Sequence, residues 1–156
     1  MVALSSSNPA VVNVPATVTI PQWATSVSYT VITSPVAQLD ASTISASSGN
    51  AMQTSTLTVA PPTPIALILD QSSIEGESSC SGTVELSGPA PRDGVLITLS
   101  SSNTMVASVP DTVTIPAGAT TATFIVNTIS VPESTSVTFS ASYQGMTRMV
   151  NLTVSP

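Results

Sequence analysis

Hydrophobic and polar residues alternate along most of the chain, which is the pattern of β-strands that bury one face. In the second part of the chain this alternation predicts seven strands, lettered in chain order: A Ile65–Leu69, B Cys80–Leu86, C Val95–Leu99, D Val109–Ile115, E Ala122–Val126, F Val137–Tyr143 and G Met149–Val154. Turn residues such as Asp93-Gly94 and Gln144-Gly145 lie between them. No stretch has a convincing helical period, so we expect an all-β fold of the Greek-key sandwich type.

Every second residue of these strands is expected to face the core. The inward positions are Ile65, Leu67 and Leu69 in A, Cys80, Gly82, Val84 and Leu86 in B, Val95, Ile97 and Leu99 in C, Val113 and Ile115 in D, Phe124 in E, Val137, Phe139 and Ala141 in F, and Val150, Leu152 and Val154 in G.

The chain contains an internal repeat in which matching residues are separated by a constant 95 positions. Val14-Pro15-Ala16-Thr17-Val18-Thr19-Ile20-Pro21 recurs as Val109-Pro110-Asp111-Thr112-Val113-Thr114-Ile115-Pro116. About 26 of 61 paired positions are identical, without a gap. A solenoid repeat has a period of about 20–50 residues, whereas a small sandwich domain has about 100. The repeat therefore predicts two tandem domains.

The two copies are unequal in length. We expect a partial domain at residues 1–60 with strands C to G, a Pro-rich linker at 61–64 and a complete domain at 65–156 with strands A to G. In the first copy the same registers place apolar residues at Val2, Leu4, Val18, Ile20, Val27, Tyr29, Val31, Ile44, Ala46, Leu57 and Val59.

The first copy lacks counterparts of strands A and B. Met1 aligns with Leu96, inside strand C, so the segment is expected to be cut from a longer array or to borrow strands from a partner. In either case we expect an open strand edge and an exposed apolar face in the first copy.

The second copy carries the motifs Gly82-Thr83-Val84-Glu85-Leu86-Ser87-Gly88-Pro89, Ile115-Pro116-Ala117-Gly118-Ala119-Thr120 and Val137-Thr138-Phe139-Ser140-Ala141-Ser142-Tyr143. With these motifs the sequence resembles the tandem immunoglobulin-like (BIG-type) repeats of bacterial extracellular and surface proteins. The resemblance covers nearly the whole chain. It implies tandem Ig-like β-sandwiches and an extracellular or cell-surface location, and it brings no shared catalytic residues.

Charged residues are scarce and mostly acidic. The net charge is −6, and the only basic side chains are those of Arg92 and Arg148. Nucleic-acid binding needs a basic patch, which this composition does not supply. No run of about 18 apolar residues is present either, so we expect no membrane insertion.

The residue inventory argues against an enzyme. Without His or Lys, the chain cannot form a Ser-His-Asp triad, a Ser-Lys dyad or a Schiff base. A carboxylate pair for glycoside hydrolysis would have to come from eight acids scattered on predicted turns, where exposure to solvent explains them better. We expect no cofactor and no metal site.

Five side chains leave a choice between a structural and a functional interpretation. Cys80, the single cysteine, is expected to be a small buried hydrophobe rather than a redox or linking group. Asp70, Glu75 and Glu77 bracket the turn from A to B, which we place near the linker. They are expected to be solvated charges, with calcium binding as the other interpretation.

Trp23 replaces the turn residue Gly118 of the other copy and is the candidate for contact with a partner. Local packing over the loop is the other interpretation. The expected function is that of a structural spacer or self-assembling repeat in an extracellular surface or fibre protein, with neighbouring repeats or further copies as partners through the open edge. The alternative is an adhesive module that recognises a glycan or a protein.

Overall fold

The computed structural model describes residues 1–156 and consists of β-strands and loops, which confirms the all-β prediction. The chain divides into two compact units, Met1–Pro61 and Pro62–Pro156, called unit 1 and unit 2 below. Neither unit has a helix that is long and apolar enough to span a membrane.

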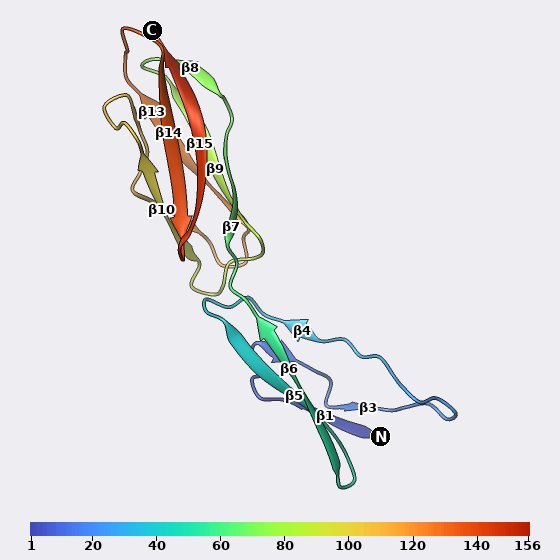
Figure 1. Ribbon diagram of the computed structural model, residues 1–156. Coiled ribbons are helices and arrows are strands. Elements are labelled where there is room, and N and C mark those ends of the chain that lie inside the picture. The colour runs from blue at the N-terminus through green and yellow to red at the C-terminus, as the bar shows by residue number, and fades with distance from the viewer. The chain divides into compact units, whose positions relative to one another are not determined.

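Unit 2 is a two-layered sandwich of nine strands (Figure 1). They are β7 (Pro64–Leu69), β8 (Ser73–Glu75), β9 (Ser79–Leu86), β10 (Val95–Ser101), β11 (Ala107–Ser108), β12 (Thr112–Ile115), β13 (Thr121–Thr128), β14 (Thr135–Tyr143) and β15 (Met146–Ser155). One sheet has the order β11-β13-β9-β7 and the other the order β12-β10-β14-β15-β8. In immunoglobulin lettering the first sheet is D-E-B-A and the second contains C-F-G, so unit 2 has the strand order of an Ig-like sandwich.

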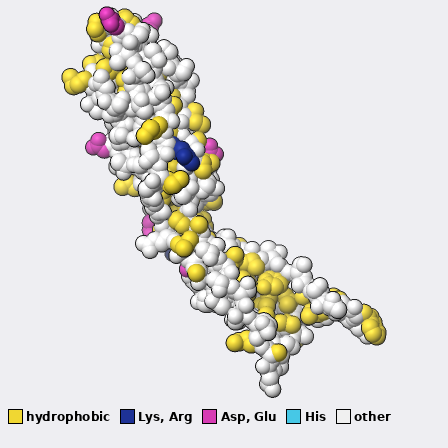
Figure 2. All heavy atoms as spheres, viewed as in Figure 1, with side chains coloured by type: hydrophobic (Ala, Val, Ile, Leu, Met, Phe, Trp, Pro, Cys, Tyr) yellow, Lys and Arg dark blue, Asp and Glu magenta, His cyan; other side chains and the backbone are white.

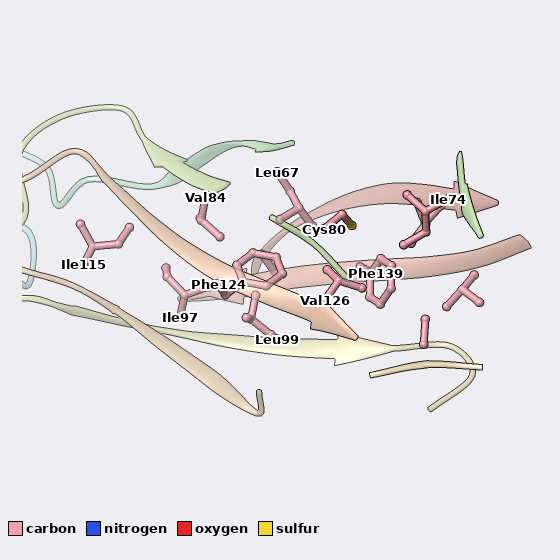
Figure 3. Packing of buried hydrophobic residues seen from close by; sticks show 14 of the residues in the cluster. Leu67, Ile74, Cys80, Val84, Ile97, Leu99, Ile115, Phe124, Val126 and Phe139 are labelled. Atoms are coloured by element: carbon pink, nitrogen blue, oxygen red, sulfur yellow. The ribbon is translucent and has the colours of Figure 1, made fainter. Parts of the chain in front are cut away.

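The core of unit 2 is aliphatic with two aromatic rings. Inward side chains from both sheets surround Phe124 and Phe139, which are 5% and 1% exposed (Figure 3). Strands β9 and β10 alternate strictly between buried and more exposed residues, because one face of each meets the opposite sheet. The inward positions predicted for strands B, C and F are confirmed.

Strand A differs from the prediction at its start. Ile65 is 46% exposed, whereas Pro64 is buried. The register between β7 and β9 shifts between Pro64 and Ala66, and this bulge reverses the alternation locally. Leu67 remains in the core, and Leu69 packs against it. β7 already begins at Pro64, the last residue of the predicted linker.

The predicted strand D, Val109–Ile115, starts too early, because only Thr112–Ile115 of it is a strand, and the separate strand β11 before it was not predicted. Ala107–Ser108 pairs with β13, and Thr112–Ile115 pairs with β10 in the other layer. The chain crosses between layers at Val109-Pro110, where proline has no N–H to donate to a ladder. The short β8 was not predicted. It runs parallel to β15 over three pairs, too few residues to show an alternation.

Unit 1 has six strands: β1 (Val2–Ser6), β2 (Val12–Asn13), β3 (Thr17–Val18), β4 (Ile32–Thr33), β5 (Asp40–Ser48) and β6 (Ala51–Val59). They form a four-stranded sheet of order β3-β1-β5-β6 and a two-stranded ribbon of β2 and β4. Between β3 and β4 the chain leaves the sheet and forms a long loop (Figure 1).

The strands of unit 1 repeat the register of unit 2 at the offset of the sequence repeat. Leu4 pairs with Ala46 as Leu99 pairs with Ala141. In the smaller ribbon, the pairing of β2 with β4 likewise matches that of β11 with β13. No strand of unit 1 corresponds to β7, β8 or β9.

One predicted strand of unit 1 does not form. The segment with Val27, Tyr29 and Val31 was expected to match strand E, but only Ile32–Thr33 is a strand there. Strand E of unit 2 is held along its length by β9. Because unit 1 has no such neighbour, the alternating pattern alone does not produce a strand.

Candidate functional site

Unit 1 exposes an apolar surface that its counterpart in unit 2 buries. We call this surface the open face and define it by the side chains of Val2, Ile20, Val27, Tyr29, Ile44, Leu57 and Val59, all of them half-buried or exposed. Figure 2 shows hydrophobic side chains gathered on residues 1–61, between the β5–β6 hairpin and the loop from β3 to β4. An exposed apolar surface of this kind marks a place where another molecule or segment binds.

Matched positions show how much burial unit 1 lacks. Ile20 is 39% exposed, whereas Ile115 at the same repeat position is 0% exposed. Tyr29 is 39% exposed, and its counterpart Phe124 is 5% exposed. The pairing of β1 with β5 matches that of β10 with β14, but unit 1 has no counterpart of β7 to β9, and the segment with Tyr29 forms no strand. The lower burial in unit 1 goes with these missing strands.

The backbone beside the open face is also unpaired. The chain from Ser26 to Val31 belongs to no strand, and no backbone hydrogen bond joins it to the rest of the chain. In unit 2 the equivalent residues form part of β13, which pairs with β9 over seven residue pairs from Thr121 to Asn127. The segment therefore presents free N–H and C=O groups in addition to apolar side chains.

Part of unit 1 remains well packed. Val12 is 0% exposed, and Leu4 and Val36 are nearly buried. At one end of this small core Asn8 donates a hydrogen bond from Nδ2 to Asp40 at 2.9 Å, and the hydroxyl of buried Ser42 donates to the same carboxylate. This polar cluster fixes the start of β5, and no buried side-chain nitrogen or oxygen atom in it lacks a hydrogen-bond partner.

Trp23 is at the tip of the loop from β3 to β4 and is 94% exposed. The amide of Ala24 donates to the carbonyl of Pro21 at 3.1 Å, which closes a tight turn around it. The φ angle of Trp23 is 69°, close to the 76° of Gly118 in the matching turn. A left-handed conformation is costly for a residue with a Cβ. Because the side chain of Trp23 is almost fully exposed, the interpretation that it packs over the loop is wrong. Contact of Trp23 with a partner stays a prediction.

A groove on unit 1 was not predicted from the sequence. It has a volume of about 380 Å³ and is lined by Asn13, Val14, Pro15, Thr30 and Ile32. Ile32 replaces Asn127 of the other copy and is 63% exposed. This exchange of a polar residue for an apolar one was the only signal in the sequence.

Cys80 lies in the core of unit 2. Its side chain is 4% exposed and forms no disulfide. Burial raises the pKa of the Cys80 thiol above its ordinary value, and the nearby charge of Asp70 raises it further. A thiol held in its neutral form is a poor nucleophile.

The three acidic residues of the turn from A to B do not lie near the linker, and that prediction is wrong. β7 starts at the linker and runs to Leu69, so Asp70 lies at the end of β7 that is far from the linker. Glu75 in β8 pairs with Ser155, the last residue of β15. The carboxylate of Asp70 accepts a hydrogen bond from the amide of Ser81 at 3.0 Å. Nowhere in the chain do three acidic or cysteine side chains group as metal ligands would.

Comparison with known proteins gives structural likeness only. No protein-family model and no curated protein matches the sequence. Among solved structures, a Bacteroides ovatus GH5 xyloglucanase in complex with a XXXG heptasaccharide is similar, with 16% identity and a TM-score of 0.36 over 58% of this chain and 19% of that one. A chimeric titin Z1Z2-Z1Z2 tandem functionalised with a GRGDS peptide is similar with 11% identity and a TM-score of 0.28 over 73% of this chain and 62% of that one. The chain thus spans less than two thirds of either protein.

Proposed function

We propose that this chain is a structural repeat segment of an extracellular surface or fibre protein, which spaces other parts and assembles with further copies or repeats through the open face of unit 1. One observation carries the proposal. The same strand framework occurs twice in the same register, but only unit 2 contains the strands that cover its apolar face. An uncovered apolar face beside unpaired backbone is a site of association.

The outer surface of unit 2 supports a passive role. Hydroxyl groups line its strands, as in the 2.8 Å hydrogen bond between Ser100 and Ser140 across β10 and β14. A surface with few charges and many hydroxyls lets repeats lie close together without strong repulsion. The extracellular or cell-surface location follows from the resemblance to bacterial surface repeats and belongs to the same proposal.

Sedimentation velocity over a range of concentrations tests the proposal. We expect concentration-dependent association of the intact chain. Tyr29→Asp places a charge on the open face and is expected to abolish association, whereas the control Met52→Asp, at a 66% exposed position of β6, leaves it unchanged. Monodisperse monomers at high concentration, or equal loss in both variants, would contradict assembly through this face.

A second candidate function is adhesion through Trp23. An almost fully exposed Trp at a loop tip can stack on a sugar ring or enter a pocket of a partner protein. A glycan array probed with the wild-type chain and with Trp23→Ala tests the glycan form of this idea. Binding that Trp23→Ala loses would support it, and absence of binding by either protein would remove it.

A further inference from the structure

We infer that the open face of unit 1 binds an extended polypeptide segment with the residue pattern of β9, which adds to residues 26–33 as an antiparallel strand. This inference rests on the proposed function and names the partner at the same site. Strand addition of this kind joins two chains through backbone hydrogen bonds, and pockets for alternate side chains select the partner.

The register of unit 2 specifies what the added segment must carry. Phe124 lies opposite Gly82, and a Cβ on Gly82 would overlap the ring of Phe124. Tyr29 has the position of Phe124 in the repeat, so its ring needs a glycine opposite. Two residues to either side of Gly82, the small apolar side chains of Cys80 and Val84 face the core. The partner pattern is therefore apolar, any, glycine, any, apolar.

The frame for this addition already exists in unit 1. β4 pairs with β2 so that Thr33 lies opposite Val12, which is the register of Thr128 and Ala107 in unit 2. β4 thus fixes the direction and position of the chain that precedes it. Only the residues from Ser26 to Val31 still have to become a strand.

The alternative occupant, a second copy that packs its open face against this one, satisfies less of the site. Face-to-face packing buries the apolar side chains, but it leaves the N–H and C=O groups of Ser26–Val31 unpaired in a drier environment, which is unfavourable. An added strand buries the apolar side chains and also pairs the N–H and C=O groups of this segment. The only charged side chain of unit 1 is that of Asp40, so the face suits an uncharged segment and offers no basic group to an anionic lipid or nucleic acid.

The probe for this site is a synthetic peptide of residues 62–91 with Cys80→Ala, added to the full chain. Hydrogen–deuterium exchange with mass spectrometry reports the amides of residues 26–33. We expect this peptide to slow their exchange by at least about tenfold. The matched peptide that also carries Gly82→Val is expected to have no effect, because its side chain occupies the space of the Tyr29 ring. In the chain, Tyr29→Phe should keep the response and Tyr29→Asp should lose it.

Three results would overturn the inference: no slowing at a peptide concentration of about 1 mM, equal slowing by both peptides, or slowing confined to unit 2. Sedimentation of the same samples separates this inference from the proposed function. If the chain stays monomeric but the peptide protects residues 26–33, the strand site is supported and self-assembly is contradicted. If the chain assembles while the peptide neither protects residues 26–33 nor competes with assembly, self-assembly is supported and the strand site is contradicted.

Discussion

Gly82 and Phe124 are cross-strand neighbours in unit 2, and the aromatic ring covers the glycine so closely that no side chain fits there. This contact joins β9 to β13 in the middle of the core. Tyr29 occupies the same position in unit 1 without a neighbouring strand. Unit 2, where a strand with a glycine lies opposite the ring, therefore differs at this position from unit 1, where no strand lies opposite Tyr29.

Gly82→Ala is expected to destabilise unit 2 by about 1–3 kcal/mol, because the added methyl group displaces the ring of Phe124 or the strand itself. Urea denaturation followed by far-UV circular dichroism measures the loss. Gly88→Ala is the control, since a Cβ at Gly88 meets no atom within 4 Å. Equal stability of both variants would show that the ring does not lie over Gly82.

Truncation of matched aromatic residues should have unequal effects. Phe124→Ala removes a buried ring and is expected to cost about 3–5 kcal/mol of unfolding free energy. Tyr29→Ala removes a partly exposed ring and is expected to cost less than about 1 kcal/mol. Urea denaturation of the monomeric chain measures both values, and a cost for Tyr29→Ala equal to that for Phe124→Ala would mean that unit 1 is closed.

Trp23→Gly is expected to stabilise unit 1 relative to Trp23→Ala by about 1 kcal/mol, because glycine adopts a positive φ without steric cost. Hydrogen exchange of β3 and β4, the strands that flank this loop in the chain, reports the difference. Faster exchange in Trp23→Gly than in Trp23→Ala would contradict the left-handed turn.

Cys80 should resist alkylation by iodoacetamide in the folded protein and react after unfolding in urea. Its raised pKa also predicts a pH dependence. Above the ordinary value of 9.0 the unfolded thiol loses its proton while the folded thiol keeps it, so stability is complete at lower pH and falls as the pH rises through this range. In Cys80→Ala the urea midpoint should decline less as the pH rises, because this variant has no thiol to titrate. An unchanged pH profile in Cys80→Ala would contradict the burial of the thiol.

The alternation of apolar and polar residues predicted most of unit 2, because its strands bury one face and each pairs with a neighbouring strand. It failed where the backbone departs from simple alternation, at the bulge after Pro64 and at the crossing near Pro110. It also failed at Tyr29, whose segment has the right alternation without a neighbour to pair with. Strand formation depends on non-local pairing, which a single sequence does not contain.

The candidate site was predicted in outline. The constant repeat offset was enough to expect an open face, and the match of Trp23 with Gly118 was enough to place it in a turn. The absence of a strand at residues 26–31 came from the three-dimensional arrangement alone, and the replacement of Asn127 by Ile32 was the only sequence signal for the groove.

Native-state hydrogen exchange on the chain, at a dilution where sedimentation shows monomers, decides whether unit 1 has an open face. Residues 121–128 in β13 and residues 26–33 in unit 1 are the matched segments. We expect strong protection of the amides of β13 that face β9, and exchange close to the unstructured rate for residues 26–31. Equal protection of the two segments in the monomer would contradict the open face and everything proposed from it.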